Sequence, residues 1–147
     1  MNERKRLLFL CTGNSARSQM AEGLLRHEAG DRFEVFSAGT HPSLVRPEAI
    51  AVMREIGIDI SGHRSKSIEE LLKSDEFTGQ NLDTVITVCD NAKESCPVFP
   101  RKTRRLHWPF EDPASVQGTE EDRKDAFRKT RDRIHGRIMV FLGEGNA

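Results

Sequence analysis

One short segment near the start of the chain carries residues that could do nucleophilic chemistry. Cys11 directly follows the apolar run Leu7–Leu10, and Arg17 and Ser18 come after five small or polar residues. A cysteine thiolate is a strong nucleophile, and an arginine guanidinium offers a fork of donors that matches a tetrahedral oxyanion. A lone cysteine at the end of a strand would more simply be a buried, inert thiol. The spacing of Cys11 and Arg17 instead favours a nucleophile aimed at a phosphate-like anion.

The residues between Cys11 and Arg17 suit a tight loop that binds an anion. A loop whose backbone amides converge at the start of a helix presents partial positive charge to a bound anion. Such surroundings lower the pKa of a cysteine thiol from ~8.5 to ~3.5–7.5, and a hydrogen bond from Ser18 would favour the thiolate further. The candidate anion-binding residues are Thr12, Gly13, Asn14, Ser15, Ala16, Arg17 and Ser18.

Strands and helices alternate along the chain, as the spacing of apolar residues indicates. The predicted strands are Leu7–Leu10, Phe33–Gly39, Thr84–Val88 and, more weakly, Thr103–Trp108. The predicted helices are Ser18–Ala29, a helix that begins at Pro47 and ends before Gly57, Ser67–Lys73, and a last helix with Thr119 as its N-cap. Ile50, Met53 and Ile56 should mark one face of the second of these helices, and Phe127, Ile134, Ile138 and Phe141 should line one stripe of the last. Residues Ser74–Gln80 look like a loop.

This order predicts an α/β fold, a three-layer open four-stranded parallel sheet with helices on both faces. A single domain should span residues 1–147. Ligands of such sheets bind at the carboxyl ends of the strands, and Cys11 is predicted to lie at that edge. Cys89 ends the third predicted strand at the same edge, and Cys96 follows it seven residues later. A buried strand-end thiol and an incidental cysteine are the alternative interpretation of this pair.

The composition of the chain argues against nucleic acid and membranes as binding partners. The chain has 23 basic and 23 acidic residues, so no large positive field draws it to nucleic acid. The locally basic cluster of Arg101, Lys102, Arg104 and Arg105 is interpreted as a solvated strand flank. No apolar run approaches the ~20 residues of a membrane span, and the first apolar run is too short for a signal peptide. We therefore expect a cytoplasmic protein, monomeric, that binds neither nucleic acid nor a membrane.

The chain has three cysteines, and this odd number does not fit the disulfide framework of a secreted protein well. Their spacing also fits no compact zinc site with His107. We expect no metal centre and no bound cofactor.

The segment "CTGNSARS", Cys11–Ser18, resembles the anion loop of the low-molecular-weight protein tyrosine phosphatase superfamily. The resemblance implies a four-stranded parallel sheet, with Cys11 as nucleophile and Arg17 as oxyanion binder. It also implies a general acid, an aspartate followed by proline late in the chain. The segment "FEDPAS" offers Asp112 and Pro113 for this role, although an aspartate before proline is commonly just a turn residue.

Two features favour the thioredoxin-coupled arsenate reductase branch of that superfamily over its phosphatases. Phosphatases that act on phosphotyrosine usually have tyrosines after the Asp-Pro pair, whereas this chain has Ala114 and Ser115 there and no tyrosine at all. The segments "TVCDNAKESCP", "HWPFEDPASVQGTEED" and "SQMAEG" also resemble the arsenate reductase branch.

The resemblance implies a relay through three cysteines. Cys11 attacks arsenic and Asp112 protonates a departing oxygen. Cys89 then attacks the sulfur of Cys11 and releases arsenite. Cys96 attacks Cys89, and thioredoxin or another thiol donor reduces the final disulfide.

Two other functions stay open on the sequence alone. A phosphatase would use only Cys11, Arg17 and Asp112 to hydrolyse phosphate monoesters, since the loop would accept phosphate as readily as arsenate. A redox-sensing or anion-binding protein would use its thiols to regulate a partner.

The chain also departs from the reductases at two positions. Ala16 stands where those enzymes often have a cysteine, and Lys66 aligns with an acidic residue that helps some members to bind potassium. The other residues of that potassium site correspond to Asn14, Glu22 and Ser37. We interpret the Lys66 ammonium as a replacement for the cation, or else as a merely solvated charge.

Overall fold

A computed structural model describes residues 4–73, 82–88 and 103–144. Its centre is a four-stranded sheet in which every neighbouring pair of strands is parallel, in the order β2-β1-β3-β4. The strands are β1 (Lys5–Cys11), β2 (Phe33–Gly39), β3 (Thr84–Thr87) and β4 (Arg104–His107). The predicted α/β fold with a parallel sheet is confirmed, and so is the weaker expectation of a strand around Leu106.

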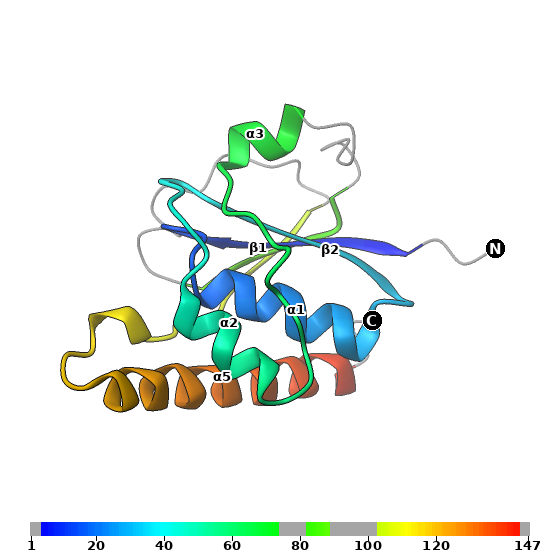
Figure 1. The fold of residues 1–147 in the computed structure, drawn as a ribbon. Helices are drawn as coiled ribbons and strands as arrows, with labels where there is room; N and C mark the ends of the chain where they lie inside the picture. The colour runs from blue at the N-terminus through cyan, green and yellow to red at the C-terminus, as the bar shows by residue number, and fades with distance from the viewer. Residues whose placement is uncertain (1–3, 74–81, 89–102, 145–147) are drawn as a thin grey trace.

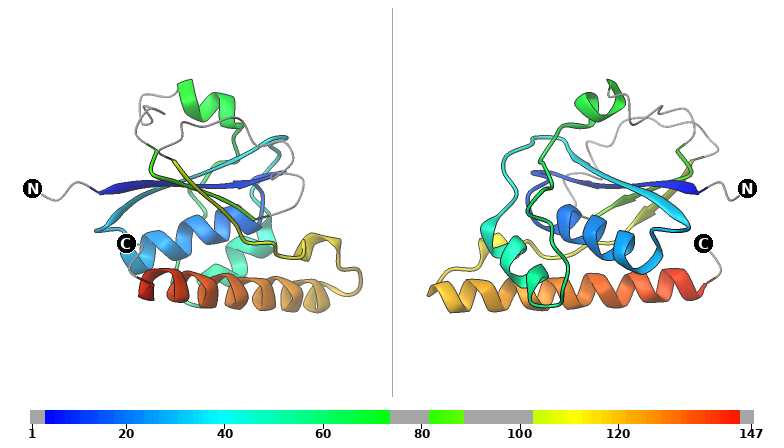
Figure 2. Two further views of the ribbon diagram at one scale, coloured as in Figure 1. Left: turned by 180° about the vertical axis from the view of Figure 1, so that it is seen from behind. Right: turned by 45° about the vertical axis from the view of Figure 1, so that its right-hand side comes forward.

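Helices cover both faces of this sheet, so the molecule has three layers. Figures 1 and 2 show α1, α2 and α5 together on one face and α3 on the other. Their bounds are α1 (Arg17–Ala29), α2 (Pro47–Arg54), α3 (Ile68–Lys73) and α5 (Glu120–Gly143), with a short 3₁₀ helix η1 (Pro113–Ser115) before α5. Among the described residues, no helix combines the length and the apolarity needed to cross a membrane.

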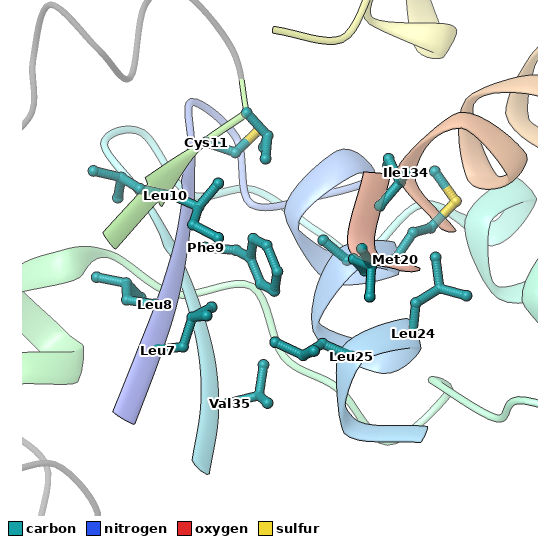
Figure 3. Packing of buried hydrophobic residues seen from close by; sticks show 14 of the residues in the cluster. Leu7, Leu8, Phe9, Leu10, Cys11, Met20, Leu24, Leu25, Val35 and Ile134 are labelled. Atoms are coloured by element: carbon teal, nitrogen blue, oxygen red, sulfur yellow. The ribbon is translucent and has the colours of Figure 1, made fainter. Parts of the chain in front are cut away.

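The core forms around β1, the strand whose sequence is apolar on both faces. Its residues Leu7–Leu10 are fully buried, as expected for a central parallel strand. Phe9 points towards α1, whereas Leu8 and Leu10 point to the opposite side of the strand (Figure 3). The stripe predicted for the last helix is confirmed, because Phe127, Ile134, Ile138 and Phe141 are all buried.

Local side-chain chemistry explains where α5 begins, whereas α2 ends earlier than its apolar residues predicted. Thr119 caps α5 as predicted, since its side chain accepts from Asp122 N and the Asp122 carboxylate accepts from Thr119 N. The prediction that Ile56 shares one face of α2 with Ile50 and Met53 was wrong. The helix ends at Arg54, so Ile56 leaves its apolar face and is 41% exposed, and the chain turns at Gly57 with φ 82°. The predicted loop Ser74–Gln80 lies outside the described residues.

Candidate active site

Cys11 is the last residue of β1, at the carboxyl edge of the sheet where parallel strands leave room for a ligand. It pairs in register with Gly39, the last residue of β2, and its side chain is buried. Figure 3 shows Cys11 at the end of the strand that carries the core residues Leu7–Leu10. The fold therefore holds the thiol on a rigid element and places it directly before the loop.

The loop after Cys11 is held from its carbonyl side. Each carbonyl from Cys11 to Ala16 accepts a hydrogen bond. The donors, in order, are Thr40 N (3.1 Å), His41 N (2.8 Å), Ser43 N (3.1 Å), Gln19 Nε2 (3.1 Å), Arg46 N (2.9 Å) and Met20 N (2.8 Å). Every peptide bond in the described residues is trans, so the N–H after each carbonyl points the opposite way. The amides of residues 12–17 are thus turned away from the segments that bind the carbonyls, as an anion-binding loop requires.

Arg17 begins α1 and is held against the segment that contains the predicted general acid. Its Nη1 donates to the carbonyl of Phe110 at 3.0 Å, and its Nη2 lies 3.8 Å from Asp112 Oδ2. The side chain is only 12% exposed, and its buried Nε finds no hydrogen-bond partner among the described residues. A buried donor without a partner is costly. A bound oxyanion would satisfy this Nε, so the arginine geometry supports the predicted role.

Asp112 occupies a turn position and also lies beside Arg17. Its Oδ1 accepts from Ala114 N at 3.0 Å and so caps η1, which is the ordinary work of a turn aspartate. Its Oδ2 faces Arg17, and the side chain is 46% exposed. One carboxylate oxygen fixes the orientation of the residue while the other lies beside the arginine that would hold the substrate. The geometry brings Asp112 to Arg17 although 95 positions separate the two in the numbering (112 − 17).

Asn14 fixes the shape of the loop. It is fully buried and has φ 47°, a left-handed conformation that is costly for most residues. Its side chain makes four hydrogen bonds: Nδ2 donates to Ser18 Oγ (2.8 Å) and Ser37 Oγ (3.0 Å), and Oδ1 accepts from Gln19 Nε2 (3.0 Å) and Lys66 N (3.0 Å). Because Ser18 Oγ accepts from Asn14, its own proton is free to be donated elsewhere. The predicted hydrogen bond from Ser18 to the Cys11 thiolate stays a prediction.

Gly39 is a functional position that the sequence interpretation missed. A Cβ atom at this residue would lie 2.6 Å from Thr12 O and 3.0 Å from both the N and the Cβ of Asn14. These neighbours are mostly backbone and cannot move aside cheaply. The end of β2 therefore needs glycine so that the anion loop can pack directly over it. A glycine ending a strand predicted to lie next to Cys11 was the signal available in the sequence.

The residues of the predicted cation site do meet, but Glu22 pairs with a different cation from the one expected. Glu22 is buried, accepts from Ser37 Oγ, and forms an ion pair with Arg26 Nη2 at 2.6 Å. The Lys66 ammonium donates to the carbonyl of Arg64 at 3.1 Å. Burial lowers the pKa of Lys66, while the charge of Glu22 opposes that shift. Arg26 was not considered from the sequence, and the replacement of a cation by Lys66 stays a hypothesis.

His63 joins this cluster, although we assigned no role to any histidine from the sequence. Its Nδ1 lies 3.0 Å from Gln19 Oε1, and its Nε2 lies 3.3 Å from Arg26 Nη1 and 3.9 Å from Glu22 Oε2. Burial lowers the pKa of His63; the charge of Glu22 opposes this shift, and the charges of Arg26 and Lys66 add to it. No periodic pattern links His63 to Gln19, because the two are 44 positions apart and meet only in the fold.

The environment of His63 predicts that the protein loses stability as the pH falls below 6.5, the ordinary pKa of histidine. The folded chain binds this proton less readily than the unfolded chain, so acid favours unfolding. The stability that neutral His63 contributes is fully present above the pKa of this histidine in the unfolded chain, and it is lost as the pH falls below that value. Urea unfolding between about pH 7.5 and pH 5 should show a shallower pH dependence for His63→Gln. If the unfolding free energies of the wild type and of His63→Gln depended equally on pH, His63 would not be the source of this loss of stability.

The predicted resolving cysteines, Cys89 and Cys96, lie outside the described residues. The last described residue before them is Val88, which is buried and donates its N–H to the carbonyl of Leu10 at 3.0 Å. The chain thus leaves β3 directly beside the residue that precedes Cys11.

Comparisons with known proteins show which family the chain belongs to. The family model for low molecular weight phosphotyrosine protein phosphatase matches residues 6–144. An arsenate reductase from Halalkalibacterium halodurans is 44% identical over 142 residues, which cover 97% of this chain and 98% of that protein. A solved arsenate reductase in the phosphate binding state has a TM-score of 0.72 and 33% identity, covering 95% of this chain and 98% of that one. A thioredoxin-dependent arsenate reductase from Corynebacterium glutamicum has a TM-score of 0.71 and 29% identity, covering 96% of this chain and 61% of that one. The chain belongs to the low molecular weight phosphotyrosine protein phosphatase family.

Proposed function

We propose that this protein reduces arsenate to arsenite through a relay of three cysteines, Cys11, Cys89 and Cys96. One observation carries the proposal: the loop between Cys11 and Arg17 turns its amides away from its anchored carbonyls, and Arg17 keeps a buried, unpartnered donor within the described structure. This arrangement suits a tetrahedral oxyanion. The full-length relative that is 44% identical is named an arsenate reductase, which supports arsenate as the oxyanion.

The first half of the reaction uses the described residues. The loop amides and Arg17 hold the three non-reacting oxygens of arsenate, and the Cys11 thiolate attacks the arsenic atom. A sulfur–arsenic bond forms and an arsenic–oxygen bond breaks. Asp112 donates a proton to the departing oxygen, which leaves as water. Asp112 Oδ2 lies 3.8 Å from Arg17 Nη2, so its protonated carboxyl group would stand next to the bound substrate.

The second half transfers two electrons from thiols to arsenic. The Cys89 thiolate attacks the sulfur of Cys11, and the electron pair of the sulfur–arsenic bond passes to arsenic, which leaves as arsenite. Cys96 then attacks Cys89, which frees Cys11 and leaves a Cys89–Cys96 disulfide. A dithiol donor reduces that disulfide. We assign this role to thioredoxin because a structural relative is described as thioredoxin-dependent.

Hydrolysis of phosphate monoesters is a second candidate, because the family is named for phosphatases. The first half of that reaction would be the same, with a phosphoryl group on Cys11 and an alcohol protonated by Asp112. Water would then release phosphate. The residues after Pro113 are Ala114 and Ser115, and the chain has no tyrosine to pack against a phosphotyrosine ring. We therefore propose arsenate reduction as the main activity and expect phosphatase activity as a secondary one.

The proposal also includes the wider expectations from the sequence. The protein works as one domain spanning residues 1–147, as a monomer in the cytoplasm, without a bound cofactor and without nucleic acid or membrane partners. The balanced charge of 23 basic and 23 acidic residues supports the expectation about nucleic acid.

The function is tested by coupling the purified protein to thioredoxin, thioredoxin reductase and NADPH. Added arsenate should cause NADPH oxidation with one arsenite formed per NADPH consumed. Omitting thioredoxin should stop turnover after the first reaction cycle, while hydrolysis of p-nitrophenyl phosphate should not depend on thioredoxin. Phosphatase activity without any arsenite formation would contradict arsenate reduction and favour the second candidate.

A further inference from the structure

The carbonyl of Gly13 has a second donor that comes from a distant part of the chain. Ser65 Oγ donates to Gly13 O at 2.9 Å, beside the bond from Ser43 N at 3.1 Å. The same Ser65 oxygen accepts from Ser43 N at 3.0 Å. One hydroxyl thus joins three segments: the anion loop, the chain after β2 and the chain before α3.

The peptide held by Ser65 is the one that precedes the strained residue of the loop. It joins Gly13 to Asn14, whose φ is 47°. The Asn14 side chain is anchored by its own four hydrogen bonds, but these fix the residue and not the plane of the peptide before it. Gly13 contributes no side chain that could hold this plane. The orientation of the Gly13–Asn14 peptide depends on what binds its carbonyl oxygen.

We propose that Ser65 is a positioning residue that holds the Gly13–Asn14 peptide with its N–H on the anion side of the loop. Because the peptide is trans, rotating this plane would move the Asn14 N–H away from the anion and turn the Gly13 carbonyl dipole towards it. A carbonyl oxygen there would repel both a bound oxyanion and the Cys11 thiolate. Without Ser65, Ser43 N would remain as a donor to Gly13 O at 3.1 Å, so the carbonyl would lose the shorter of its two good hydrogen bonds. Ser43 Oγ cannot replace Ser65, because it lies 3.5 Å from Gly13 O, too far for a good hydrogen bond.

The inference rests on the proposed function of this loop, and it is tested by binding and thiol reactivity rather than by turnover. The parent for the test carries Cys89→Ser and Cys96→Ser, so that Cys11 is the one remaining thiol of the chain. Ser65→Ala is compared with Ser67→Ala in this parent. The Ser67 hydroxyl accepts from Glu70 N at 3.0 Å and caps α3, so Ser67→Ala also removes a hydroxyl that is hydrogen-bonded to the backbone, from the same segment but away from Gly13.

Two measurements distinguish positioning from a general loss of stability. Calorimetric titration with inorganic phosphate should show affinity weaker by about five-fold for Ser65→Ala, the usual net effect of one hydrogen bond. The pH midpoint for alkylation of Cys11 by iodoacetamide should rise in the same variant. Ser67→Ala should match the parent in both measurements.

Two results would overturn the positioning role. Ser65→Ala could bind phosphate and react with iodoacetamide like the parent, or Ser67→Ala could change both properties by the same amount. Failure of the proposed function would show elsewhere, as a wild-type protein that binds phosphate normally but forms no arsenite. The comparison of Ser65→Ala with Ser67→Ala would still decide the role of Ser65.

Discussion

Replacing Cys11 with serine should abolish both arsenate reduction and phosphate-ester hydrolysis, with losses of about 10⁴-fold or more, as expected when a covalent nucleophile is removed. Both reactions begin with attack by the Cys11 sulfur, and a serine hydroxyl stays protonated where a thiol in an anion loop ionises. The substitution is nearly isosteric at the end of β1, where Cys11 is buried, so the fold should persist.

Phosphate binding provides the control for Cys11→Ser. The oxyanion is held by the loop amides and Arg17, so calorimetry should show that the variant still binds inorganic phosphate. Initial rates for both reactions, measured at saturating substrate, give the size of the loss. Arsenite formation by a folded Cys11→Ser protein at a tenth of the wild-type rate or more would show that the nucleophile lies elsewhere.

Replacing Cys89 or Cys96 with serine should separate the two activities. Thioredoxin-coupled arsenate turnover should fall to background in both variants, because each lacks one step of the disulfide relay. Hydrolysis of p-nitrophenyl phosphate should continue, since it needs only Cys11, Arg17 and Asp112. Full arsenate turnover by either variant would show that the relay is wrong.

A single-turnover experiment distinguishes the two positions in the relay. Without any external thiol, Cys96→Ser should release one arsenite per protein and trap a Cys11–Cys89 disulfide, which mass spectrometry of a non-reduced digest would detect. Cys89→Ser should release no arsenite, because the bond between sulfur and arsenic is never attacked. Wild-type protein should release one arsenite and carry the Cys89–Cys96 disulfide. The reverse pattern in the two variants would exchange their assigned order.

Most of the fold could be predicted because the signals lie within single elements. The apolar run Leu7–Leu10 indicated a buried central strand, and the four apolar positions of the last helix defined the face it buries. Thr119 and Asp122 are three residues apart, so the capping box could form locally. The failure at Ile56 has a different cause: the backbone leaves the helix at Arg54, before the apolar spacing ends.

Only the part of the site that lies in one contiguous motif could be predicted from the sequence. Cys11, Arg17 and the loop between them are contiguous, so their spacing alone suggested an anion site. Gln19, His63 and Ser65 act through contacts between segments more than 40 positions apart, and no spacing rule links them. The sequence also did not reveal that Asp112 makes a turn hydrogen bond with one carboxylate oxygen while the other lies beside Arg17.

The anchoring of the loop carbonyls has a consequence for transplanting this activity. The donors include the backbone of residues 40–46, the Ser65 hydroxyl and the Lys66 amide to Asn14, all beyond β2 in the chain. A short peptide or a foreign scaffold that carried the octapeptide "CTGNSARS" alone would lack these donors, which hold the loop in its shape. The anion loop is therefore not a self-contained module; grafting it would require the β2–α2 connection and the segment between α2 and α3 as well.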